Sequence, residues 1–150
     1  ELEKKLSEAR SKKPSKKILK LAYLGVPPIM NDLYSYIEEK GAKVVFNEVQ
    51  REFSFPRHGK AKNIFEQYLN YTYTYGIDFR IKNLEKDLEE RDIKGIIHYT
   101  QKFCHRALDN IVLKEKLPYP LLNIEADREA VLDERTKLRL DAFIDMLGDM

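Results

Sequence analysis

Short runs of aliphatic residues alternate along the chain with segments in which apolar residues recur every three or four positions. The runs predict buried strands over residues 18–26, 43–49, 93–100 and 119–126. The amphipathic segments predict helices over 30–41, 61–73, 79–92, 105–117 and 133–147, and residues 50–60, with Pro56 and Gly59, predict a loop. Strands separated by helices pair in parallel through right-handed crossovers. The pattern therefore predicts an α/β fold, a Rossmann-like three-layer sandwich with a four-stranded, mainly parallel sheet and helices on both faces.

Three details refine the predicted helices. Asp133 precedes the last helix and predicts its N-cap. In the helix over 105–117, Leu108, Ile111 and Val112 stand at helical spacing and predict its apolar stripe. The tyrosine-rich segment 68–76 predicts core or subunit interface in preference to a ligand platform.

Composition limits the class of protein. Hydrophobic residues make up 43% of the 150 residues, enough for one core. Charged residues make up 35%, but 27 Lys and Arg balance 25 Asp and Glu, and no basic face stands out beyond the N-terminal tail, so we expect no nucleic-acid partner. No run of about 18 apolar residues is present, so we expect no membrane partner. One cysteine and no secretion signal favour a cytoplasmic location.

The chain divides into two parts by composition. Residues 1–17 are polar and rich in lysine, and they predict a linker or tail; residues 18–150 predict a single α/β domain. The first residue is Glu rather than Met, so we expect either a processed start or a piece of a longer protein.

Ligands of open parallel sheets bind beyond the carboxyl ends of the strands. We therefore expect Gly25, Gln50, Cys104 and Asp127, which follow or end the predicted strands, to share one edge. The chain has neither GxGxxG nor a P-loop motif, so we do not expect a nucleotide site at this edge. The alternative for the turn at Gly25 is a simple exit from the strand, and the alternative for Arg51 is an ordinary surface position. The candidate substrate contacts at this edge are Gly25, Val26, Pro27, Gln50, Arg51 and His105.

Cys104 is the only cysteine. It stands between Lys102 and the pair His105 and Arg106, where a helix is expected to begin. Neighbouring cations and a helix N-terminus both favour the thiolate over the thiol. A nucleophile would need a positioned base, but adjacent residues at a helix start point apart. Zinc and iron–sulfur sites need about three or four protein ligands, and the chain has no CxxC or HxxxH spacing. From the residues alone, an inert thiol and a functional one stay equally open.

Several segments resemble the C-terminal portion of the 2-hydroxyacyl-CoA dehydratase family, which includes 2-hydroxyglutaryl-CoA dehydratase subunits and the related benzoyl-CoA reductase subunits. The resemblance runs from about Ile18 to Leu147. The strand followed by FCHR and the C-terminal segment are its most specific parts. It is carried by GVPPIMNDLYSYIEEKGAKVVFNE, EQYLNYTYTYG, IKGIIHYTQKFCHR and PLLNIEADREAVLDERTKLRLDAFIDML.

The resemblance implies a specific cofactor. Family subunits hold a [4Fe-4S] cluster through three cysteines, two of them in an N-terminal domain absent from this sequence and one after a strand of the C-terminal domain, the position of Cys104. The acyl-CoA substrate binds at the open iron. An ATP-dependent activator protein supplies a low-potential electron, and the resulting ketyl radical permits dehydration or reduction. A related second subunit is the other expected partner.

These implications define the expected function. Residues 18–150 are expected to be the C-terminal domain of such a subunit, contributing Cys104 as a cluster ligand, while the lyase activity belongs to the parent protein. Alone, the chain is expected to hold no cluster and to be inactive. The alternatives are a non-catalytic α/β module that docks through the tyrosine segment and the helix from Asp133, and a thiol enzyme with Cys104 as nucleophile.

Overall fold

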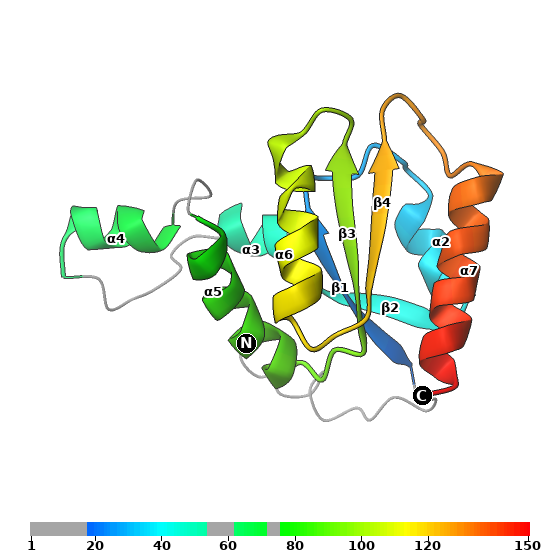
Figure 1. The fold of residues 1–150 in the computed structure, drawn as a ribbon, viewed down its shortest axis with the longest axis horizontal. Helices are drawn as coiled ribbons and strands as arrows, with labels where there is room; N and C mark the ends of the chain where they lie inside the picture. Colours follow the sequence, from blue (N-terminus) through cyan, green and yellow to red (C-terminus); the bar gives the residue numbers. More distant parts are fainter. Residues whose placement is uncertain (1–17, 54–61, 72–75) are drawn as a thin grey trace, which may run out of the picture.

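The structure is a computed structural model that describes residues 18–53, 62–71 and 76–150. It contains a four-stranded sheet in the order β2-β1-β3-β4, and every pair of neighbouring strands is parallel (Figure 1). This confirms the predicted α/β class. The predicted tail over residues 1–17 lies outside the described residues. The strands are β1 (Leu19–Gly25), β2 (Ala42–Asn47), β3 (Gly95–Gln101) and β4 (Leu121–Ala126).

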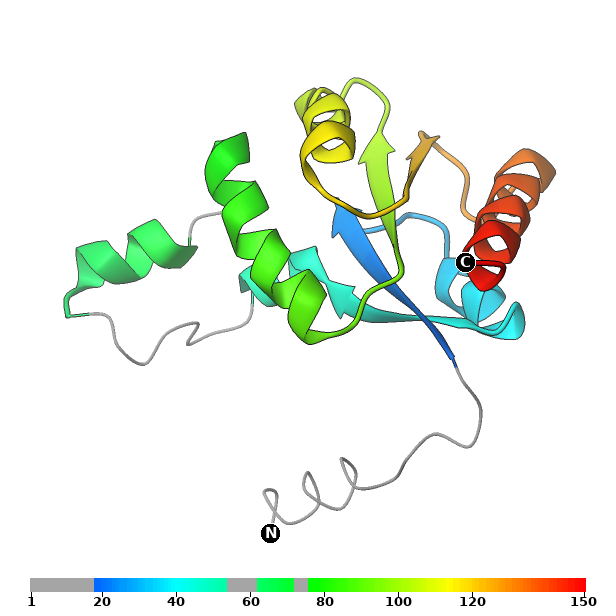
Figure 2. The ribbon, with the colours of Figure 1, turned by 60° about the horizontal axis from the view of Figure 1, so that its bottom comes forward.

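Helices cover both faces of the sheet, as Figure 2 shows. On one face lie α2 (Leu33–Glu39) and α7 (Glu134–Gly148), and on the other lie α5 (Ile77–Glu90) and α6 (Asp109–Lys116). The Asp133 carboxylate accepts a hydrogen bond from the Thr136 amide at 2.8 Å, which confirms the predicted N-cap of α7. No helix among the described residues is long and apolar enough to cross a bilayer.

The core consists of two apolar clusters, one on each face of the sheet. In the central strand β1, Leu21 and Tyr23 face α2 and α7, whereas Ala22 and Leu24 face the α5 and α6 side. Because a central strand in a parallel sheet is buried on both faces, its sequence is apolar without alternation. That is why β1 and β3 could be predicted from their aliphatic runs.

The second strand and the loop after it were predicted wrongly in part. The strand ends at Asn47, not at residue 49, and residues 50–53 belong to helix α3 (Glu48–Phe53) instead of a loop. The Asn47 side chain accepts a hydrogen bond from the Gln50 amide at 3.1 Å, the contact that an N-cap residue makes with the third residue of a helix. Residues 54–61 of the predicted loop lie outside the described part of the chain.

The predicted helix over 105–117 is two elements, the 3-10 turn η1 (His105–Ala107) and α6. The turn is closed by bonds between residues three apart, from the Ala107 amide to the Cys104 carbonyl and from the Leu108 amide to the His105 carbonyl. A 3-10 turn has 3.0 residues per turn, so it shifts the phase of the apolar stripe. Leu113 and Leu117 are the buried residues, the predicted position Val112 packs partly buried against the same cluster, and the predicted positions Leu108 and Ile111 are exposed.

Helix α4 (Ile64–Tyr71) forms within the predicted segment 61–73 but stands away from the sheet (Figure 1). Its Ile64, Phe65 and Tyr68 side chains are exposed. Of the two interpretations of the tyrosine segment, Tyr68 therefore fits an interface better than core. Residues 72–75 of that segment lie outside the described residues.

Candidate functional site

The carboxyl ends of the four strands meet at one edge of the sheet, and the candidate residues lie there. Gly25 ends β1, Gln50 lies in α3 directly after β2, Cys104 follows the end of β3, and Asp127 follows β4. Because all the strands are parallel, the expected common edge is present (Figure 1). The edge is thus the region in which a ligand of this fold is expected.

Cys104 lies in a turn between β3 and η1. Its side chain is a free thiol of intermediate burial, and neither apolar cluster contains it. Its amide donates to the Gln101 carbonyl at 3.0 Å, and its own carbonyl accepts from the Ala107 amide at 3.0 Å. Next to it, Phe103 has a φ of +62° and a side chain that is 98% exposed. The turn is thus ordered by backbone bonds, with an exposed Phe103 side chain and a half-buried thiol.

The turn after β1 holds the other candidates. Gly25 has a φ of +104°, and a Cβ atom at this position would lie 1.9 Å from the Tyr99 carbonyl oxygen. The Val26 amide donates to that same carbonyl at 3.2 Å, which ties the β1 exit to β3. Pro27 is exposed. This turn therefore passes against the strand that leads to Cys104.

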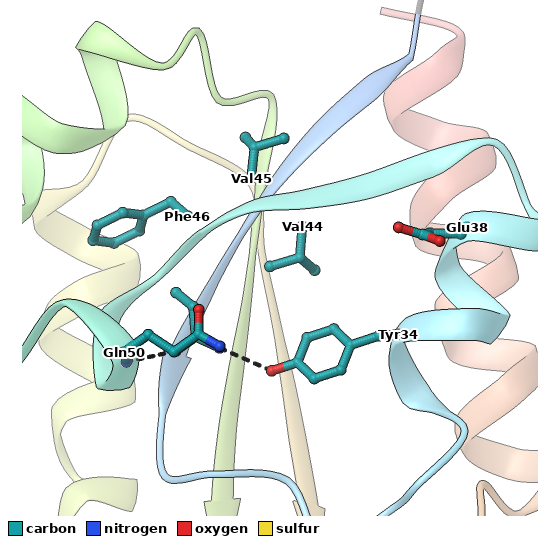
Figure 3. A pocket seen from close by; sticks show the side chains of 7 residues that line it. Tyr34, Glu38, Val44, Val45, Phe46 and Gln50 are labelled. Carbon is teal, nitrogen blue, oxygen red and sulfur yellow. Dashed lines mark hydrogen bonds between the residues drawn. The ribbon is translucent and has the colours of Figure 1, made fainter. Parts of the chain in front are cut away.

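The two candidates after β2, Gln50 and Arg51, lie in helix α3. Gln50 lines a pocket of about 280 Å³ beside the edge strand β2, together with Tyr34 and Phe46 (Figure 3). The Arg51 guanidinium is bound to the carboxylates of Glu52 and Asp87, so it does not present an open anion site. His105 is exposed beside Cys104.

A buried network of charged residues beneath this edge was not predicted from the sequence. Arg80 of α5 is fully buried, and its Nε and Nη2 donate to the two carboxylate oxygens of Glu48, each at 2.7 Å. Its Nη1 donates to Asp109 at 2.7 Å, and Arg106 reaches the same Asp109 oxygen at 3.5 Å. The Gly25 amide donates to Glu48 at 3.1 Å. The network therefore joins the Gly25 turn to the turn that carries Cys104.

Burial and the charge of Arg80 together determine the protonation states of Glu48 and His98. Burial raises the pKa of Glu48, but the hydrogen bonds and charge of Arg80 outweigh burial and lower it overall, so the carboxylate is ionised. The pKa of His98 is lowered to about 4, first because the ring is buried and second because Arg80 is positively charged. At neutral pH the network is an ion network beside a neutral imidazole.

The sequence carried one signal for this network. Arg80 stands four and eight residues before Leu84 and Leu88, so it lies on the apolar stripe of its own helix. A charged residue on such a stripe is buried only with a partner. Glu48, directly after a buried strand, had no comparable pattern.

No group of three or more His, Cys, Asp or Glu residues within 18–53, 62–71 and 76–150 is arranged to hold a metal ion. Cys104 could therefore contribute one ligand, with the remainder coming from elsewhere. A family model, 2-hydroxyglutaryl-CoA dehydratase, D-component, matches residues 1–147, and no curated protein matches the chain. The chain belongs to the family described by that model, 2-hydroxyglutaryl-CoA dehydratase, D-component.

Proposed function

We propose that this chain is the C-terminal domain of a [4Fe-4S]-dependent subunit that acts on an acyl-CoA, of the 2-hydroxyacyl-CoA dehydratase or benzoyl-CoA reductase type, and that Cys104 is a cluster ligand. Membership of the dehydratase family supports the reaction class. The observation that carries the ligand assignment is the place of Cys104. It is the only cysteine, it lies at the carboxyl edge of a parallel sheet, and it is outside both apolar clusters.

The chemistry of Cys104 fits an iron–sulfur cluster as a single ligand. Thiolates are the usual protein ligands of [4Fe-4S] clusters, which take about three or four of them. The described residues provide no complete ligand set, so the other ligands come from outside them. The 150-residue chain by itself is therefore expected to hold no cluster and to be inactive.

The surface beside Cys104 supports contact with another protein surface. Phe103 and Leu108 are 98% and 72% exposed and lie within or next to the turn that carries the thiol, and Ile111, which is 68% exposed, lies in the following helix α6. Exposed apolar side chains that cluster in this way are typical of interfaces. We expect the polypeptide that supplies the remaining ligands to cover them.

When bound, the cluster would supply low-potential electron transfer to the acyl-CoA. The residues of this chain would then bind and orient the substrate. Gly25 pairs with Tyr99 of β3, so Gly25, Val26 and Pro27 form a turn beside that strand, and His105 is exposed beside Cys104. Gln50 and Arg51 are weaker candidates, because one lines a separate pocket and the other is ion-paired. A related second subunit and an ATP-dependent activator are the proposed partners.

The test uses the complete subunit that contains this chain, prepared anaerobically with its partner subunit and reconstituted with iron and sulfide. Cys104→Ser is expected to lower the bound iron and the visible absorbance, because serine is a poor replacement for a thiolate. The control is Lys102→Ala, an exposed position two residues away, which is expected to keep both signals. Unchanged iron content and absorbance in Cys104→Ser would show that the ligand assignment is wrong.

A non-catalytic assembly module is the second candidate, and the exposed Ile64, Phe65 and Tyr68 of α4 favour it. The same preparation separates the two functions. A purified complex that contains this subunit, folds normally and binds neither iron nor acyl-CoA would support the module.

A further inference from the structure

The buried charges beneath the carboxyl edge need an explanation beyond stability. Glu48 and Arg80 are fully buried and Arg106 nearly so. Removing such charges from water costs free energy, and well-packed apolar residues of similar volume are often as stabilising as a buried ion pair. A buried network of this size is therefore best understood through the segments that it fixes relative to one another.

Arg80 is the centre of the network. Its planar guanidinium binds both oxygens of Glu48 on one side and Asp109 on the other, each at 2.7 Å. The guanidinium is rigid, so these bonds fix the directions of the two carboxylates as well as their distances. Glu48 in turn accepts from the Gly25 amide, so Glu48 and Arg80 together bridge the end of β1 and the start of α6.

Asp109 transmits this bridge to the turn that carries Cys104. It is the first residue of α6, and its Oδ2 accepts from both Arg80 and Arg106. Arg106 belongs to η1 and is buried, whereas the neighbouring side chains of Phe103, His105 and Leu108 are exposed. Apolar packing therefore contributes little to holding this turn, and the ion network holds it from its buried side.

We propose that Arg80 and Asp109 are positioning residues that hold the Cys104 turn at a fixed place relative to the Gly25 turn. The inference rests on the proposed function, in which Cys104 is a ligand. A metal ligand must lie within about 0.2 Å of its coordination distance, so a ligand on an exposed turn benefits from a rigid support. Neither residue is bonded to Cys104 itself; both act through the Arg106 side chain of η1.

The test is hydrogen–deuterium exchange on the metal-free 150-residue chain with Asp109→Ala. The amides of Cys104, Ala107 and Leu108, which are bonded within the turn, are expected to exchange about tenfold faster or more, because a charge-assisted anchor is lost. The amides of β1 and β3 are expected to keep their protection. Arg80→Lys keeps a positive charge for Glu48 but cannot form the fork, so it is expected to loosen the same turn amides.

The matched control is Asp87→Ala. Asp87 also accepts from two arginines, Arg51 and Arg91, and its side chain is 20% exposed compared with 23% for Asp109. It lies in α5, away from the Cys104 turn. It is expected to leave exchange at Cys104, Ala107 and Leu108 unchanged.

Three results would overturn the proposal: unchanged exchange of the turn amides in Asp109→Ala, the same acceleration in Asp87→Ala, or an acceleration that extends equally through β1 and β3. The exchange measurement needs no metal, so its outcome does not depend on whether Cys104 binds a cluster. The iron content of Cys104→Ser decides that separate question.

Discussion

Gly25 is the residue at which backbone conformation most limits substitution. Its φ is +104°, and an added Cβ would meet the Tyr99 carbonyl oxygen at 1.9 Å. Gly25→Ala therefore combines a left-handed backbone with a steric clash against a central strand, and it is expected to lower the free energy of unfolding by about 3 kcal/mol or more. Urea denaturation at pH 7 measures the change.

The control for this prediction is Gly148→Ala, at the end of α7. A Cβ there meets nothing within 4 Å, and the residue is helical. Alanine is expected to stabilise this position by up to about 1 kcal/mol, since glycine is the poorer helix former. Equal effects of the two substitutions would mean that the close approach of Gly25 to β3 does not constrain the turn.

Individual residues differed in how far their roles could be predicted. Cys104 could be identified as a candidate site residue because the sequence has one thiol and the strand pattern places it at a sheet edge. For Arg80 the sequence offered only its position on the apolar stripe of α5, because its partners Glu48 and Asp109 lie 32 and 29 positions away in the sequence. Pairings of this length depend on tertiary structure, which local patterns do not encode.

At the level of elements, existence was easier to predict than ends. The four strands follow from aliphatic runs, since burial on one or both faces determines their composition. The ends of β2 and of the helix after β3 depended on a single side-chain cap at Asn47 and on the 3-10 turn after Cys104. Such local hydrogen bonds override apolar periodicity over a few residues.

In strand β3, the buried His98 makes the fold sensitive to acid. Its pKa is lowered from 6.5 to about 4, by burial first and by the charge of Arg80 second. The unfolded chain therefore takes up a proton before the folded one as the pH falls, so stability is complete above pH 6.5 and is lost toward pH 4. Between pH 7 and pH 5 we expect a loss of about 2 kcal/mol, measured by urea denaturation.

His98→Gln is the variant that checks the source of this loss. It is expected to reduce the difference in unfolding free energy between pH 7 and pH 5, because glutamine does not titrate. His105→Gln, at an exposed position, is expected to retain it. The lowered pKa of Glu48 places that carboxylate's contribution below pH 4.5, outside the interval. An undiminished loss in His98→Gln would contradict the assignment.

At the scale of the whole molecule, stability comes from the two apolar clusters on either side of the sheet. They include fully buried residues such as Leu33, Leu84 and Leu140, and burial of each leucine contributes about 1.5–3 kcal/mol. Leu140→Ala is accordingly expected to cost about 2–5 kcal/mol. Cys104→Ala, at a half-buried position outside the clusters, is expected to cost about 1 kcal/mol or less.

Because the two apolar clusters stabilise the fold, folding of this chain is expected not to depend on binding of the proposed cofactor. A metal contributes to folding only where the fold brings a ligand set together, and the described residues contain no such set. The thermal midpoint of the 150-residue chain is therefore expected to be the same with EDTA, with added iron and with neither, in a scanning calorimetry series in which Leu140→Ala provides the destabilised reference. A shift of many degrees on adding EDTA would show that this chain binds a structural metal by itself. In that case the chain would contain a ligand set of its own, and the expectation that it holds no metal by itself would fail.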